Sequence, residues 1–194
     1  MNPQRFVASA MLALLFLAAG AAGAATLTGK VSVAGAKDNA DAVVYVDGFD
    51  GGAASGKAVM DQEGMEFVPH VLAVQTGTEV EFANSDSVSH NVFTPDGCAD
   101  RFNLGTWGKG ETRSHTFDEP CTAVILCSLH PEMEAYVVAV PTPYFAVTGA
   151  DGSYTIEGVP DGTYTVKVWH PKKKEVSRQV RVAGATEASF DLGK

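Results

Sequence analysis

The stretch Cys127-Ser128-Leu129-His130-Pro131-Glu132-Met133 decides how the rest of this sequence is interpreted. It holds a thiolate, an imidazole and a thioether at the spacing C-x-x-H-x-x-M. Soft sulfur donors with imidazole suit copper, and two histidines with one cysteine and a weak axial methionine form a mononuclear type 1 (blue) site. The stretch therefore predicts three ligands of a single copper on one loop: Cys127, His130 and Met133.

The second histidine of such a site is predicted to be His90. The apolar residues that follow it in the stretch 84–93 predict a strand that begins at His90. A ring at the head of a strand can point toward the end of a β-sandwich where the loop after Cys127 lies. Zinc could use the same donors, but an axial thioether suits copper better. His70 and His115 could bind a second metal, although each is more simply an ordinary strand or surface histidine.

Short apolar runs separated by tight turns predict an all-β chain. The sequence has 20 glycines, several of them in Asp-Gly turns between runs of Val, Ile, Thr, Tyr and Phe. Pro141-Thr142-Pro143 closes the middle block, because two prolines this close cannot lie inside a central strand. The strands predicted in this block are Val71–Val74, Val80–Phe82, His90–Phe93, His115–Phe117, Ala123–Cys127 and Tyr136–Val140.

The segments on either side of the middle block are predicted to build a second, smaller antiparallel β-sandwich. Leu27–Val33 and Ala42–Val46 supply only two strands, too few to fold alone. Alternation of apolar and polar residues in Tyr154–Ile156 and Tyr164–Trp169 predicts half-buried partners for them. We therefore expect residues 25–52 and 141–194 to form one domain, with residues 57–140 inserted in it. The alternative is a short N-terminal extension and a separate C-terminal domain.

The first 24 residues have the pattern of a secretory signal peptide. Arg5 precedes an apolar run from Phe6 to Ala22, and the small residues Ala22-Gly23-Ala24 predict cleavage after Ala24. An uncleaved membrane anchor is the alternative, but the run is short for a bilayer. The sequence thus predicts a periplasmic or secreted protein with no membrane span after signal removal.

The charge of the chain excludes some partners. Its formal net charge is -9, and loss of Arg5 with the signal peptide changes this to -10. No nucleic-acid partner is expected from such a chain. An acidic surface favours basic protein partners by steering their approach, although the charge equally keeps an exported protein soluble.

With these motifs in view, the middle block resembles the cupredoxin family, and amicyanin and plastocyanin most closely. The resemblance runs through Phe82-Ala83-Asn84, His90-Asn91-Val92 and the loop from Cys127 to Met133. It implies a Greek-key β-sandwich and a copper that alternates between Cu+ and Cu2+. It also implies that His90, Cys127 and His130 are equatorial ligands and that Met133 is axial. Further implied roles are those of Asn91 and Ser128 around the ligands and of Leu129 and Pro131 in an apolar electron-transfer patch.

The outer segments resemble the carboxypeptidase-regulatory-like β-sandwich. The resemblance rests on a D-G-x-[FY] turn at Asp151–Tyr154 and a P-x-G-x-Y pattern at Pro160–Tyr164. The whole chain resembles exported plastocyanin-like proteins, some labelled methylamine-utilisation proteins, that join this module to a cupredoxin.

The other two cysteines are predicted to pair with each other. If Cys127 binds the metal, Cys98 and Cys121 remain in an oxidising compartment, where a disulfide is expected. The alternative is that both stay free and buried.

These features predict an electron carrier and no enzyme. The sequence has no nucleophile with a paired base and no His-x-His motif of a multicopper oxidase. The expected partner is a redox protein such as a basic c-type cytochrome or a dehydrogenase. Two other functions remain open at this point: copper storage or delivery, and a cell-envelope binding module with an accessory copper site.

Overall fold

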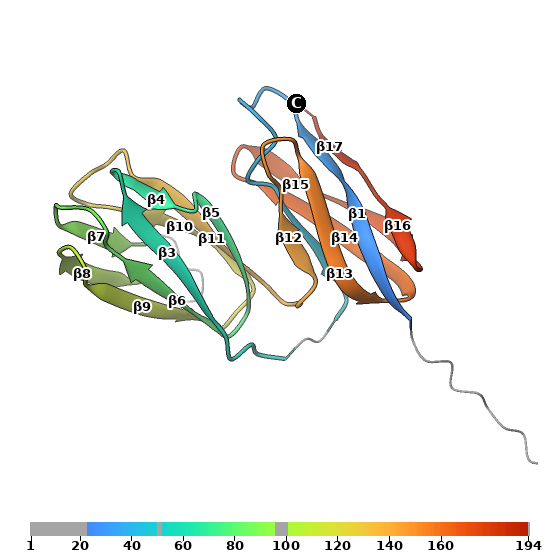
Figure 1. Ribbon diagram of the computed structural model, residues 1–194, viewed down its shortest axis with the longest axis horizontal. Coiled ribbons are helices and arrows are strands. Elements are labelled where there is room, and N and C mark those ends of the chain that lie inside the picture. The colour runs from blue at the N-terminus through green and yellow to red at the C-terminus, as the bar shows by residue number, and fades with distance from the viewer. Residues whose placement is uncertain (1–22, 50–51, 96–100, 194) are drawn as a thin grey trace, which may run out of the picture.

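The computed structural model describes residues 23–49, 52–95 and 101–193, and every regular element in them is a β-strand (Figure 1). The predicted all-β fold class is confirmed. The predicted signal peptide falls almost wholly outside the described residues. Within them, no helix is long and apolar enough to cross a membrane.

The middle of the chain forms a two-sheet sandwich, here called the copper domain. One sheet has the strand order β5-β11-β10-β7-β8, and the other has the order β4-β3-β6-β9. Along β6 buried and half-buried residues alternate, so Val80 and Phe82 point into the core between the sheets. The strands are β3 (Lys57–Glu63), β4 (Glu66–Val68), β5 (Val71–Gln75), β6 (Thr78–Ala83), β7 (His90–Phe93), β8 (Asn103–Trp107), β9 (Thr112–Phe117), β10 (Cys121–Leu126) and β11 (Glu134–Val140).

The first two strands of the chain and the last six together form the outer sandwich. β1 is antiparallel to β13 and parallel to β16 and β17, while β2 lies between β12 and β14. The chain thus leaves this sandwich after β2 and returns to it at β12. The strands are β1 (Ala24–Val33), β2 (Val43–Asp47), β12 (Phe145–Val147), β13 (Ser153–Pro160), β14 (Gly162–His170), β15 (Lys173–Val182), β16 (Ala185–Glu187) and β17 (Phe190–Leu192).

The long strand β15 begins within a run of three lysines. The turn before it ends at Lys172, and Lys173 and Lys174 lie in β15. β15 pairs with β14 along nearly its whole length. Most side chains of β15 face solvent and many are charged, so its sequence lacks the alternation of apolar and polar residues that predicts a strand.

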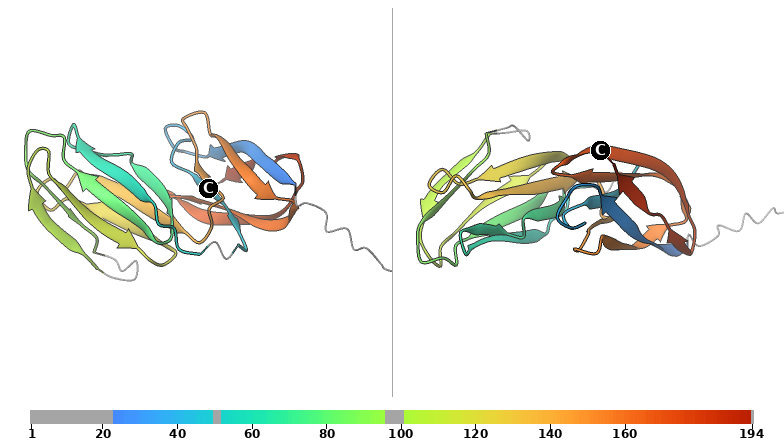
Figure 2. Two further views of the ribbon diagram at one scale, coloured as in Figure 1. Left: turned by 60° about the horizontal axis from the view of Figure 1, so that its bottom comes forward. Right: turned by 90° about the horizontal axis from the view of Figure 1, so that it is seen from above.

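The two sandwiches lie side by side and share a third apolar cluster (Figures 1 and 2). Along β2, Val44 points into the outer core, whereas its neighbour Val43 points toward the copper domain. We call the buried set Val43, Val71, Val138 and Val140 the interface core. Aromatic side chains of both domains pack against it, and the rings of Tyr136 and Trp169 lie 5.5 Å apart across the junction.

A continuous apolar contact of this kind predicts that the two sandwiches unfold together. Val138→Ala removes two buried methyl groups from the interface core and is expected to cost about 2 kcal/mol. In calorimetry of the copper-free protein, we expect one transition for the wild type and one transition at lower temperature for the variant. Two separate transitions, of which only one moves, would contradict a shared core.

Candidate metal centre

Two neighbouring strands bring the predicted ligands to the same end of the copper domain. His90 is the first residue of β7, and Cys127 directly follows β10, which runs antiparallel to β7. The start of one strand and the end of its antiparallel neighbour lie at the same end of the sheet. The loop after Cys127 then brings His130 back over this end of the sheet.

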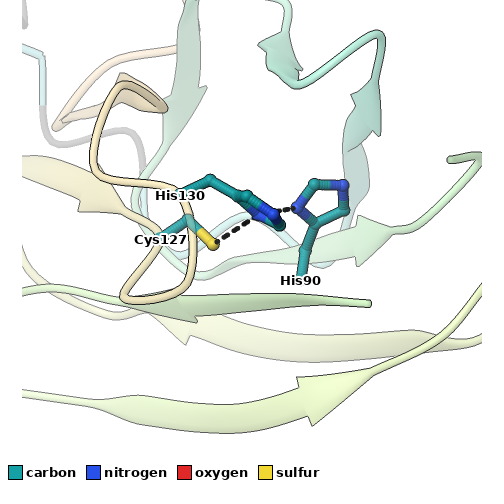
Figure 3. Close-up of side chains that lie close together, drawn as sticks. All are labelled: His90, Cys127 and His130. Carbon is teal, nitrogen blue, oxygen red and sulfur yellow. Dashed lines mark hydrogen bonds between the residues drawn. The ribbon is translucent and has the colours of Figure 1, made fainter. Parts of the chain in front are cut away.

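The donor atoms of His90, Cys127 and His130 all lie within 4.8 Å of one another (Figure 3). The Nδ1 atoms of the two histidines are 3.0 Å apart, and Cys127 Sγ lies 3.7 Å from His130 Nδ1. Ligands bound at about 2.0–2.3 Å from one ion must be this close to each other. Since two imidazole nitrogens and one sulfur suit copper, the donor set fits a single copper ion.

Burial differs among the predicted ligands. His90 is fully buried, and Cys127 and Met133 expose only 3% and 1% of their surface, whereas His130 is half-buried. Met133 packs in the same core cluster as Cys127, and its backbone N–H donates to the carbonyl of His130 at 3.0 Å. This hydrogen bond closes a turn from His130 to Met133 at the end of the loop. Coordination by Met133 itself stays a prediction.

A carboxylate that sequence reasoning missed orients His90. Asp86 Oδ2 lies 2.8 Å from His90 Nε2, and the same carboxylate accepts hydrogen bonds from the backbone N–H groups of Gly64 and Met65. Burial raises the pKa of Asp86, but these hydrogen bonds outweigh it and hold the pKa below its usual value. The ionised carboxylate favours the proton on Nε2, which leaves the Nδ1 lone pair of His90 for the metal.

The side chain of Asn91 joins the segment of His90 to the segment of Cys127. Asn91 Oδ1 accepts hydrogen bonds from the backbone N–H and the hydroxyl of Ser128 at 3.3 and 2.9 Å. The backbone N–H of Asn91 donates to Cys127 Sγ at 3.4 Å. Such a hydrogen bond stabilises a thiolate, because it places positive charge next to the sulfur.

The residues around His130 form an exposed rim. Leu129 exposes 49% of its surface, and Pro131 and Glu132 are exposed as well. Val88, which precedes His90 on the other ligand segment, is a further exposed apolar side chain. The predicted patch residues Leu129 and Pro131 are thus accessible to a partner.

Other singled-out residues have structural roles. Trp107, at the end of β8, exposes 2% of its surface and packs in the copper-domain core. His115 stacks on Phe102, and His70 pairs with Asp41 at 2.7 Å. In the described part of the chain, His90, Cys127 and His130 are the only group of three or more His, Cys, Asp or Glu side chains close enough to hold a metal.

The state of the cysteines bears on the expected disulfide. Of the two cysteines in the described ranges, Cys127 is a free, buried thiol, and Cys121 begins β10. Cys98 lies outside the described residues, so its bridge to Cys121 stays a prediction.

The bridge would close a loop of about two dozen residues and contribute roughly 3 kcal/mol in the chain-entropy model. We expect alkylation of the denatured, copper-free, unreduced protein to label one thiol, that of Cys127. Intact-mass measurement counts the labels, and three labels without prior reduction would show that no bridge exists.

Two families match this chain. Residues 54–140 match copper binding proteins of the plastocyanin/azurin family, and residues 131–193 match the carboxypeptidase regulatory-like domain. No curated protein matches the chain.

Several solved copper proteins are similar to the chain. The purple cupredoxin of Nitrosopumilus maritimus is 26% identical over 43% of this chain and 99% of its own, with a TM-score of 0.39. A reduced amicyanin variant is 26% identical over 50% of this chain and 98% of its own, with a TM-score of 0.42. The copper-containing nitrite reductase of Thermus scotoductus SA-01 is 28% identical over 43% of this chain, with a TM-score of 0.42, and this similarity spans 22% of the reductase chain.

Proposed function

We propose that this chain, which combines a plastocyanin/azurin-type copper-binding domain with a carboxypeptidase regulatory-like domain, is an exported type 1 copper protein that carries single electrons between redox partners. We propose His90, Cys127 and His130 as equatorial ligands and Met133 as the axial ligand. The observation that carries the proposal is the close approach of two imidazole nitrogens and one thiol sulfur at the end of a rigid sandwich.

The residues around the ligands do what an electron carrier requires. Copper, when bound, would supply the one-electron couple between Cu+ and Cu2+. Asp86 fixes the ring of His90, and Asn91 ties that strand to the loop of Cys127. Because these contacts hold the donors independently of the oxidation state, little has to move when an electron enters or leaves. Burial of Cys127 and Met133 keeps water from the sulfur ligands, while half-exposed His130 offers a path to the surface.

Copper storage or delivery is the main alternative, and burial of the site speaks against it. A delivery protein needs a site that a recipient's ligands can reach, but Cys127 and His90 are buried. Stopped-flow reduction by basic c-type cytochromes and a copper-transfer assay separate the two functions. We expect reduction and reoxidation within seconds and no transfer of copper to a competing apoprotein on that timescale. Transfer of copper that outpaces electron exchange would favour delivery.

The remaining parts of the proposal concern compartment and organisation. We propose export to the periplasm by the signal peptide of residues 1–24, and insertion of residues 57–140 between the two parts of the outer sandwich. The return of the chain to the outer sheets at β12 supports the insertion. We propose a basic redox protein as partner, which the acidic chain would attract. We propose no catalytic reaction for the chain itself.

A further inference from the structure

A cavity separates the ligand loop from the outer sandwich. Its volume is about 460 Å³, and Glu132, Met133 and Glu134 line it on the side of the copper domain. Pro171 and Lys172, the turn between β14 and β15, line it on the side of the outer sandwich. Met133, the proposed axial ligand, therefore lies beside a cavity whose other wall belongs to the outer sandwich.

The backbone of Lys172 is hydrogen-bonded to a buried histidine beside this cavity. The backbone N–H of Lys172 donates to Nδ1 of His170 at 3.1 Å. Burial lowers the pKa of His170, so its ring is neutral near pH 7 and Nδ1 remains an acceptor. This hydrogen bond ties the backbone of the turn to the end of β14, while the side chain of Lys172 is exposed.

The contact between the domains fixes the distance from this turn to the ligand loop. Tyr136, which also lines the cavity, follows Met133 by three residues and packs against Trp169, which precedes the turn by two. The interface core lies behind this pair, and His70 of the copper domain bonds to Asp41 of the outer sandwich. Lys172 is therefore placed relative to the ligand loop by packing on both sides.

The charges around the cavity make Lys172 electrostatically important. Three carboxylates line it, those of Glu66, Glu132 and Glu134, and Lys172 is the one lysine or arginine among its lining residues. A positive charge near a metal ion favours the reduced ion, which carries less positive charge, and so raises the reduction potential. Carboxylates have the opposite effect, and the interaction is stronger in a partly enclosed space than in open solvent.

From this arrangement we infer that the outer sandwich is a working part of the redox centre: it presents Lys172 at the cavity that Met133 also lines, and the charge of Lys172 would raise the reduction potential of a bound copper. This inference rests on the proposed function and deepens it. Lys172 acts here as a tuning residue that does not touch the metal. The inference also gives the outer sandwich a role within the electron carrier.

The test is the reduction potential of the copper-loaded full-length protein, measured by spectroelectrochemical titration at low ionic strength. Lys172→Gln keeps most of the side chain and removes the charge, and we expect a lower potential. Lys172→Glu should lower it further. Lys174→Gln is the matched control, since Lys174 is, like Lys172, an exposed lysine of the same run, but it does not line the cavity beside the ligand loop.

Salt provides a second readout. The shift in Lys172→Gln should shrink as ionic strength rises, because the Debye length falls from about 30 Å at 0.01 M to about 3 Å at 1 M. Equal potentials in the wild type and Lys172→Gln, or equal shifts in Lys172→Gln and Lys174→Gln, would overturn the inference while leaving the proposed function intact. A wild-type protein that binds no copper through Cys127 would instead overturn the proposed function.

Discussion

Cys127→Ser is expected to abolish the intense colour of the cupric protein. The colour of a type 1 site arises from charge transfer between a cysteine thiolate and cupric ion, and a serine hydroxyl cannot supply it. The free, buried thiol of Cys127 lies beside His130 and accepts a hydrogen bond from the Asn91 backbone. Optical absorption of the wild type and the variant, each loaded with one equivalent of cupric ion, measures the effect.

Met133→Gln is the companion variant. An amide oxygen can replace the thioether as a weak axial ligand, so the variant should keep copper and colour but show a changed potential. A Cys127→Ser protein that remains as intensely coloured as the wild type would show that another residue supplies the sulfur. Far-ultraviolet circular dichroism of both variants establishes that the sandwich is still folded.

Leu129→Asp is expected to lower the bimolecular rate of electron transfer with the physiological partner by about tenfold or more, which corresponds to roughly 1.4 kcal/mol or more. Leu129 is the half-exposed apolar residue next to His130, and a charge there would have to be desolvated when a partner docks. The copper spectrum should be unchanged, because the side chain points away from the buried ligands. Stopped-flow kinetics at several partner concentrations gives the rate.

Val59→Asp is a suitable control for this surface. Val59 is equally exposed but lies in β3, away from the ligand loop. If the outer sandwich docked the partner, both variants would leave the rate almost unchanged. An unchanged rate in Leu129→Asp would show that electrons do not leave through His130.

Glu132→Lys tests the charge of the same rim. Glu132 is exposed beside Pro131, and in an acidic protein it would attract a partner with basic residues around its cofactor. Charge reversal should reduce the salt dependence of the bimolecular rate. An unchanged dependence on ionic strength would show that Glu132 does not face the docked partner.

The sequence could indicate a metal-binding loop because Cys127, His130 and Met133 lie within seven residues. Their donor types favour copper, and the strand predicted to begin at His90 suggested that residue as the second histidine. The structure then placed His90 beside Cys127 and His130 without any further sequence signal. Contacts near in sequence, such as the hydrogen bond from Met133 to His130, follow from the same short loop.

Features that depend on distant pairing could not be predicted in the same way. Asp86 is held by the backbone of Gly64 and Met65, about twenty residues earlier, and no spacing rule links these positions. Val43 and Val44 are adjacent apolar residues, which indicates a strand buried on both faces. The sequence does not show that Val44 packs in the outer core and Val43 against the copper domain. The role of the turn at Lys172 likewise appears only once the two sandwiches are packed together.

The most direct test is a spectroelectrochemical titration of the wild-type protein loaded with one equivalent of copper. We expect one copper per chain and a reversible one-electron couple, with colour that appears on oxidation and disappears on reduction. A correctly folded protein that stays colourless with cupric ion, or whose colour does not follow the potential, would contradict a single Cys127-bound copper that carries electrons.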